Sequence, residues 1–290
     1  MNPYIRRAIV GIGVAAVVIV LLGATYQGVS TALERRDFPA PGHLSDVGGH
    51  QLHIRCEGEG PLTVILEAPE AGLSAMWGLV QPALAESARV CSYDRAGLGW
   101  SEAGDGPFDA RTVPIELHAV LAREKVLPPY LMIGQSLGAA FALLYIAQYP
   151  EEVIGLVLLD DPSAGARSTP SPDAVRAFGR HLGYAPWLAR TGALRAGRLL
   201  SNRTGALPDQ AAGAVGAFLT RPDHLTRAGR EFASWNDTIA LATAVRLPAH
   251  LPTTRIESSR PSLGSYVDSR SGADAVVRAA AGIIASVQTR

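Results

Sequence analysis

Residues 130–150, YLMIGQSLGAAFALLYIAQYP, place a serine where it could act as a nucleophile. Ser136 lies between Gly134 and Gly138, after one apolar run and before a second that ends at a proline. A G-x-S-x-G sequence between a strand and a helix puts the serine on a sharp turn that presents its hydroxyl. Glycines are expected on both sides because larger side chains would collide with the neighbouring strand or helix. Ser136 is therefore the candidate nucleophile.

The elements that must position Ser136 follow an α/β order between about residues 61 and 161. The sequences LTVILEA and GLVLLD are continuous apolar runs, typical of parallel strands covered on both faces. Between them, MWGLVQPALAE, TVPIELHAVLARE and the run after Ser136 carry apolar residues at helical spacing. The alternating sequence DVGGHQLHIRC predicts a hairpin of half-buried strands. We expect a mostly parallel central sheet with helices on both faces.

Composition narrows the classes of function. With 290 residues and 48% hydrophobic content, the chain can bury a large core. The 26 basic and 26 acidic residues leave no net charge, so nothing in the balance points to a nucleic-acid partner. The sequence also gives no reason to expect a cofactor or a metal.

The N-terminal segment, residues 1–36, is expected to lie outside the globular domain. Residues 8–33 carry no charge, and the first 17 of them, AIVGIGVAAVVIVLLGA, are apolar or glycine. That length approaches the ~20 residues that a helix needs to cross a bilayer. We predict a single-pass membrane anchor with the catalytic domain outside the cytoplasm. A cleaved signal peptide and a buried core helix stay open as alternatives.

Two cysteines lie in runs that we interpret as strands. Cys56 ends HQLHIRC, and Cys91 lies within ARVCSYD. An exported domain would permit a disulfide, and neighbouring strands would bring the two Cα atoms within reach of one. A pair of buried thiols is the alternative, and the sequence does not decide between the two.

The alternation of strands and helices stops at Pro162. Residues 163–247 predict helices broken by STPSP, YAPW and TGALP, so we interpret them as a helical lid inserted between core residues 37–162 and 248–290. Between Ala174 and Pro208 this segment has no acidic residue, and it has arginines at positions 176, 180, 190, 195, 198 and 203. Such a basic face could rest on anionic lipid, or its arginines could simply be solvated.

The order of these segments resembles the α/β-hydrolase family, particularly its bacterial single-chain serine hydrolases with an N-terminal apolar segment. The resemblance rests on the turn YDRAGLGWSE, the sequence GQSLG around Ser136, and YPEEVIGLVLLD. It extends from about residue 40 to residue 161. It implies an α/β-hydrolase fold in which Ser136 attacks an ester or amide.

The resemblance also implies an oxyanion hole made of two backbone N–H groups. Leu137, at the start of the helix after the serine, would supply one of them. By position, Glu70 in the loop after TVILEA would supply the other. The Glu70 carboxylate opposes the charge that such a hole must stabilise, and Pro69 restricts the backbone that must aim the amide. The loop therefore departs from the family pattern.

A second departure concerns the general base. The resemblance implies a glycine-histidine pair before a terminal helix, here GADAVVRAAAGIIASV; Gly264 matches the glycine, but Ser265 replaces the histidine. No histidine follows His250, which becomes the candidate substitute base. His181 and His224 in the predicted lid are alternatives. Those in the first half offer no better choice: His43, His50, His53 and His118.

The acid of a triad has no clear counterpart. We take Asp161, at the end of GLVLLD, as the candidate, with Asp160 and Glu257 as alternatives. Two functions follow from the sequence. One is a membrane-anchored serine hydrolase for esters or amides with an impaired triad. The other is a catalytically degenerate module that keeps the fold for binding or interaction.

Overall fold

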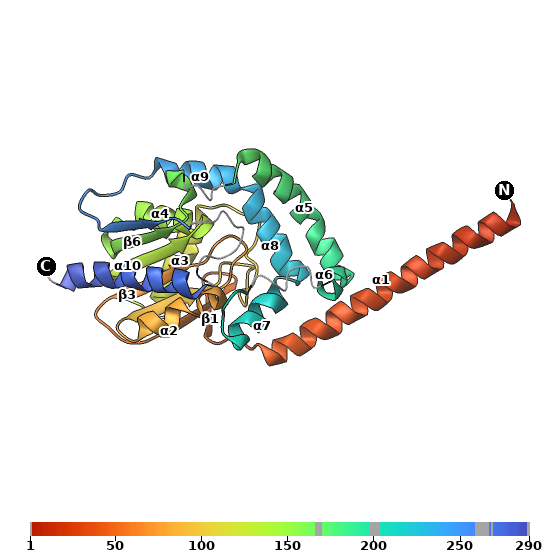
Figure 1. Cartoon of the computed structure of the whole chain (residues 1–290), viewed down its shortest axis with the longest axis horizontal. Coiled ribbons are helices and arrows are strands. Elements are labelled where there is room, and N and C mark those ends of the chain that lie inside the picture. The colour runs from red at the N-terminus through yellow and green to blue at the C-terminus, as the bar shows by residue number, and fades with distance from the viewer. Residues whose placement is uncertain (1, 166–169, 198–203, 259–266, 268, 289–290) are drawn as a thin grey trace.

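The computed structural model describes residues 2–165, 170–197, 204–258, 267 and 269–288 (Figure 1). The described strands form one seven-stranded sheet in the order β1-β2-β4-β3-β5-β6-β7. Their bounds are β1 His43–Asp46, β2 Gln51–Glu57, β3 Thr63–Glu67, β4 Arg89–Tyr93, β5 Tyr130–Gln135, β6 Val153–Leu159 and β7 Thr253–Ile256. Strand β2 pairs antiparallel with both β1 and β4, and the other pairs are parallel. The predicted hairpin and the mostly parallel sheet are confirmed.

Helices cover both faces of this sheet, as the continuous apolar strands predict. On one face Ile65, Met132 and Leu156 pack with residues of α3 and α4. On the other, Val64 and Leu131 pack with residues of α2 and α10. The helix bounds are α2 Val80–Ala85, α3 Thr112–Arg123, α4 Leu137–Gln148 and α10 Arg270–Gln288. Three layers result, with the core on both sides of the strands.

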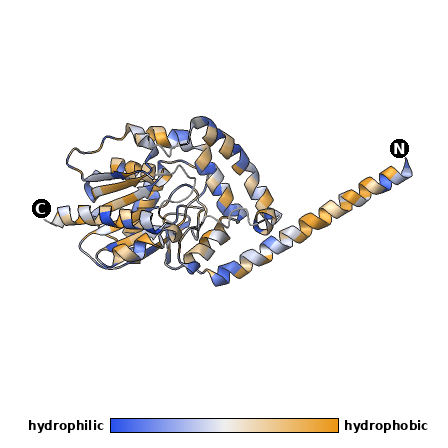
Figure 2. Cartoon of the chain, in the orientation of Figure 1, coloured by the Kyte–Doolittle hydropathy of each residue, from blue (hydrophilic) through white to orange (hydrophobic). Residues whose placement is uncertain are grey.

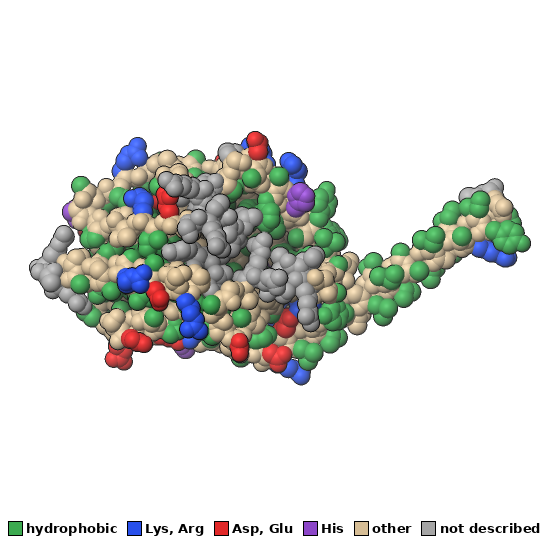
Figure 3. Space-filling view, in the orientation of Figure 1, with side chains coloured by type: hydrophobic (Ala, Val, Ile, Leu, Met, Phe, Trp, Pro, Cys, Tyr) green, Lys and Arg blue, Asp and Glu red, His purple; other side chains and the backbone are tan. Residues whose placement is uncertain are grey.

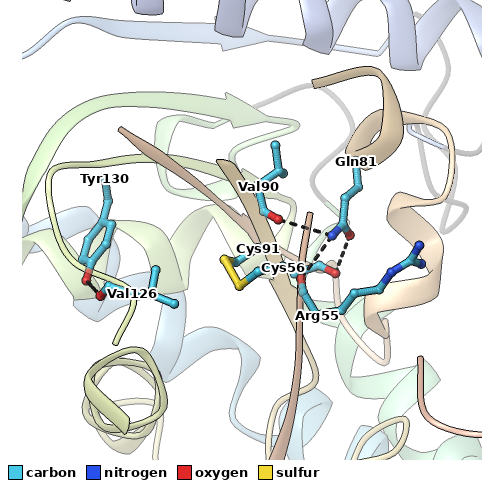
Figure 4. Close-up of a disulfide and its surroundings, with 8 residues drawn as sticks. Arg55, Cys56, Gln81, Val90, Cys91, Val126 and Tyr130 are labelled. Carbon is cyan, nitrogen blue, oxygen red and sulfur yellow. Dashed lines mark hydrogen bonds between the residues drawn. A yellow bond between two sulfur atoms is a disulfide. The ribbon is translucent and has the colours of Figure 1, made fainter. Parts of the chain in front are cut away.

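Cys56 and Cys91 form a disulfide, which settles the alternative that the sequence leaves open. The two residues face each other in the antiparallel pair of β2 and β4, with Cα atoms 4.1 Å apart (Figure 4). Gln81 of α2 lies beside them and donates to the carbonyls of Arg55 and Val90, on the same two strands. The bridge closes a separation of 35 residues, which stabilises a fold by about 2 to 4 kcal/mol.

A helical segment separates β6 from β7. It contains α5 Pro172–Arg190, α6 Ala193–Ala196, α7 Asp209–Phe218, α8 Pro222–Ala233 and α9 Trp235–Ala244, with no strand among its described residues. The helical content predicted for residues 163–247 is thus observed. Figure 1 shows α5 and α8 over one end of the sheet, the end opposite the C-terminus. Whether this segment acts as a lid stays a prediction.

The N-terminal helix α1, Pro3–Asp37, extends away from the rest of the molecule (Figure 1). It is long and apolar enough to cross a membrane, and a signal sequence would pass the same test. Its first part is strongly apolar in Figure 2. Its last part packs on the helical segment: the buried Gln27 donates to the Thr220 carbonyl at 3.1 Å, and Glu34 pairs with Arg195. Residues near the end of α1 are therefore integrated into the folded domain.

Candidate active site

Ser136 occupies the sharp turn between β5 and α4 that the sequence predicts. Its backbone has φ 52° and ψ −118°, and its N–H donates to the Leu159 carbonyl of β6 at 2.8 Å. A positive φ is strained for a residue with a Cβ atom. A Cβ at Gly134 would clash with the first turn of α4, and one at Gly138 with the backbone at Glu67 and Ala68. The close approach of strand and helix thus requires both glycines and leaves the serine half-exposed.

The carboxyl group of Glu70 lies beside Ser136, where the two expected oxyanion donors converge. Burial raises the pKa of Glu70, while the nearby Ser136 hydroxyl and the backbone N–H groups of Glu70 and Leu137 act to lower it. Both predicted donor groups therefore lie beside this carboxyl group, whose Oε2 is buried and has no hydrogen-bond partner in the described structure. When ionised, the Glu70 carboxylate places a negative charge where an oxyanion would form.

Arg95 holds the loop that carries Glu70. Its guanidinium donates to the carbonyls of Ala68 and Pro69 at 2.7 and 2.8 Å. Glu231 of α8 accepts from the Ala71 N–H at 3.3 Å and pairs with Arg95 at 2.9 Å. The turn YDRAGLGWSE contains Arg95, but its sequence does not predict this role, and no sequence pattern predicts the role of Glu231.

Arg95 is fully buried between two carboxylates, those of Glu67 and Glu231. Burial raises the pKa of Glu67 to about 7 although Arg95 works to lower it. Burial also acts to raise the pKa of Glu231, but the charge and hydrogen bonds of Arg95 outweigh it and hold that pKa below its ordinary value. Below neutral pH, the positive charge of the Arg95 guanidinium is therefore neutralised mainly by the Glu231 carboxylate.

The candidate base His250 lies away from Ser136. It is exposed in the segment between α9 and β7, before the amino end of β7. Ser136 follows the carboxyl end of β5, and β5, β6 and β7 run parallel. The two residues thus lie at opposite edges of the sheet, so the position of His250 does not support its predicted role. Ser265 lies outside the described residues.

Asp160 and Asp161 lie at the same sheet edge as Ser136, but both are occupied. Asp161 is buried; it accepts from the N–H and hydroxyl of Ser163 at 3.0 and 2.6 Å and pairs with Arg255. Asp160 accepts from the Ser258 N–H at 2.7 Å. Glu257 is exposed after β7.

The histidines of the helical segment make no hydrogen bond with Ser136 in the described structure. His224 is buried, and its two ring nitrogens have the hydrogen-bond pattern of a neutral imidazole. The Gly99 N–H donates to Nδ1 at 3.1 Å, and Nε2 lies 3.0 Å from the Ala71 carbonyl. Burial lowers the pKa of its ring. His181 is exposed on α5, with Nδ1 2.7 Å from the Ala177 carbonyl. Among the titratable side chains of the described residues, that of Glu70 lies beside the Ser136 hydroxyl.

A second cluster combines serine, histidine and aspartate. His53 Nδ1 lies 3.0 Å from Asp94 Oδ2 and 3.4 Å from Ser74 Oγ. All three side chains are buried, and His53 Nε2 has no hydrogen-bond partner in the described structure. No group of three possible metal ligands occurs among the described residues.

A cavity of about 460 Å³ leads from the surface of α5 to Glu70. Its walls are mostly leucine, alanine and phenylalanine side chains of α5 and α8, and its polar lining includes Glu70 and His181 of α5. It is of the size and polarity that binds small apolar ligands.

Curated relatives share part of this chain. A Bacillus subtilis protein, YqjL, is 31% identical over 116 residues, which cover 40% of this chain and 45% of YqjL. The 2-hydroxymuconate semialdehyde hydrolase of Pseudomonas sp. strain CF600 is 30% identical over 148 residues, 47% of this chain and 51% of the relative. The chain spans less than half the length of several other curated proteins that it matches.

Solved structures share the fold over nearly their whole length. The epoxide hydrolase CorEH superposes with a TM-score of 0.64 at 18% identity, covering 84% of this chain and 98% of CorEH. The enol-lactonase of Burkholderia xenovorans LB400 gives 0.57 at 16% identity, covering 84% of this chain and all of the lactonase. The sequence profile of the alpha/beta hydrolase fold matches residues 66–213, about half of the chain. These matches agree with the sheet order and with the turn at Ser136, and the chain belongs to the α/β hydrolase fold family.

Proposed function

We propose that the protein is a hydrolase in which Ser136 attacks an ester or amide and Glu70 accepts its proton. One observation carries the proposal: the Ser136 hydroxyl, on a strained turn, lies beside the carboxyl group of Glu70, whose pKa is raised by burial. A carboxylate becomes a stronger base as its pKa rises toward the working pH. The relative named as a 2-hydroxymuconate semialdehyde hydrolase supports hydrolysis as the class of reaction.

The steps balance with these two side chains. Ser136 Oγ bonds to the carbonyl carbon while its proton moves to Glu70, leaving an oxyanion on the substrate. The proton then passes to the leaving alcohol or amine as its bond to carbon breaks, and an acyl-serine remains. Water attacks the acyl carbon, Glu70 takes a proton from it, and the acid leaves as Ser136 regains a proton. Once protonated, Glu70 no longer repels the oxyanion.

Slow turnover is part of the proposal. The Glu70 carboxyl lies beside the N–H groups of Glu70 and Leu137 and must move before a substrate oxygen can bind there. Asp161 is held by Ser163 and Arg255 and is not assigned a role in proton transfer. The same occupancy favours the second candidate function, a binding module with little or no turnover.

Hydrolysis of a short 4-nitrophenyl ester by the full chain tests this function. We expect Ser136→Ala to abolish the rate above background and Glu70→Gln to lower it by about 10² to 10⁴. The rate should rise with pH through a range above that of an ordinary glutamate, because Glu70 must be ionised to accept a proton. Glu59→Gln, at an exposed site, is the matched control. A rate unchanged in Ser136→Ala would refute the hydrolase.

We also propose that α1 is a retained, single-pass anchor with the rest of the chain outside the cytoplasm. The contacts of Gln27 and Glu34 with the helical segment support retention, because cleavage after the apolar stretch would remove them or leave them on a short tail. Alkaline carbonate extraction tests it: we expect the intact chain to stay in the membrane pellet. Recovery of a shortened, soluble chain would show a cleaved signal instead.

A further inference from the structure

The end of α5 meets α1 where the exposed apolar part of α1 ends. A Cβ at Gly23 would clash with the Thr191 carbonyl just after α5, and one at Gly192 would lie 2.8 Å from the Gly23 carbonyl. Before Gly23, residues 2–22 of α1 are exposed. Figure 1 shows α5 running across the direction of α1 at this level rather than along it. A bilayer crossed by the apolar stretch of residues 8–24 would therefore have its surface next to α5.

The outward face of α5 has the composition of a membrane-surface helix. Tyr184, Trp187 and Leu188 are 71%, 68% and 48% exposed, which is unusual for large apolar side chains. Arg176, Arg180 and Arg190 are exposed on the same helix, and Asp173 is its one acidic residue. Aromatic rings with arginines are favoured at the headgroup level of anionic membranes. Figure 3 shows hydrophobic side chains gathered at the end of the molecule that meets α1.

The 460 Å³ cavity opens beside this face. Tyr184 and Leu188 contribute to its wall and are exposed, whereas Leu225 and Ala228 of α8 line it and are buried. Its inner end is Glu70, next to Ser136. The apolar lining thus continues from the proposed membrane surface to Glu70, the one carboxyl group among the described residues of the wall.

We propose that this cavity binds the apolar chain of a ligand dissolved in the bilayer, with α5 lying on the surface of the membrane that α1 crosses. The ligand is a long-chain ester, whose chain fills the cavity and whose carbonyl group reaches Glu70 and Ser136. The inference rests on the proposed anchoring of α1 and gives the proposed hydrolase its substrate class. Binding of the chain does not require Ser136 to react.

Placement of α5 is tested on the full chain in nanodiscs of phosphatidylcholine and phosphatidylglycerol with brominated acyl chains. Trp77 and Trp235 are buried and Trp100 is partly buried, so contact with lipid should quench Trp187 in particular. We expect quenching relative to unbrominated discs, and its loss in Trp187→Phe. Equal fluorescence in both kinds of disc, from a chain that resists carbonate extraction, would overturn the inference while leaving the anchor intact.

Occupancy of the cavity is tested in the same discs with a long-chain alkyl ester that bears a diazirine near the chain end. We expect photolabelling of α5 and α8 peptides, retained in Ser136→Ala. Ala185→Trp, which fills the cavity wall, should lower labelling about tenfold, the cost of excluding about two methylene groups. Ala174→Trp, exposed on α5 outside the cavity, is the matched control. Labelling equal in both variants would overturn the site, whatever the hydrolysis assay gives.

Discussion

Two serine–carboxylate clusters lie on either side of the neighbouring residues Asp94 and Arg95. Asp94 binds His53 and the backbone of Ser74, whereas Arg95 holds the loop of Glu70 beside Ser136. The first cluster contains every residue type of a catalytic triad, and the second has no histidine. Yet the second has the half-exposed serine on a strained turn.

Hydrogen-bond geometry explains why the first cluster, which contains serine, histidine and aspartate, is structural. In a triad, one ring nitrogen faces the acid and the other faces the serine. In the first cluster Asp94 and Ser74 both approach His53 Nδ1, and Nε2 is buried without a partner. All three side chains of this cluster are buried. Residue types alone therefore do not define an active site; exposure and the arrangement of the atoms do.

The largest expected effect is a loss of stability when Arg95 is replaced. Arg95→Met should lower the free energy of unfolding by about 3 to 5 kcal/mol, because the buried Glu231 charge loses its 2.9 Å ion pair and keeps the longer one with Arg227, at 3.9 Å. Arg95→Met combined with Glu231→Gln should recover part of that loss. Urea denaturation measures both. A single variant as stable as the parent would show that the network does not hold the Glu70 loop.

The second effect is a pH dependence that belongs to Glu67. Its pKa is about 7 in the folded chain against an ordinary 4.5, so the unfolded chain loses this proton first as pH rises. The stabilisation is present below the unfolded pKa and is lost as pH rises to about 7, by about 3 kcal/mol. Unfolding free energies across this range, compared with those of Glu67→Gln, isolate the effect. Parallel pH curves for the two chains would contradict it.

A smaller effect separates the two clusters directly. His53→Ala should destabilise the fold by about 1 to 3 kcal/mol, because it removes a hydrogen-bond partner of the buried Asp94. It should leave the reactivity of Ser136 unchanged. Denaturation and covalent labelling of Ser136 check the two parts. Loss of labelling without loss of stability would make the first cluster functional.

The smallest effect concerns strain at the turn. Ser136→Gly should stabilise the fold by about 1 kcal/mol, because glycine adopts φ 52° without a Cβ penalty. Ser136→Ala keeps the Cβ atom and should give no such gain. The difference between the two in urea denaturation is the measurement, and equal stabilities would mean that the turn is not strained.

The sheet, its covering helices and the turn at Ser136 could be predicted because each has a local pattern. Apolar runs, helical spacing and the glycines around Ser136 act over a few residues. The disulfide could not be decided, because it depends on the register that sets Cys56 opposite Cys91.

The chemistry of the site could be predicted only in part. The position of Glu70 in the sequence predicts an obstacle in the oxyanion hole, but its closeness to the Ser136 hydroxyl depends on how the loop after β3 folds. His250 was chosen because no histidine follows it, and sequence order does not show at which edge of the sheet a loop lies. Glu231 lies far along the chain from Arg95, and the two residues meet only because α8 packs against the loops at this end of the sheet, which no local sequence pattern predicts.

Covalent labelling by a fluorophosphonate probe tests the central claim most directly, since it reports an activated serine. We expect slow labelling of the full chain at Ser136, none in Ser136→Ala, a rate lowered in Glu70→Gln, and an unchanged rate in His250→Ala. Labelling that survives Glu70→Gln but is lost in His250→Ala, or a complete absence of labelling at Ser136, would contradict the assignment of Glu70 as the group that activates Ser136.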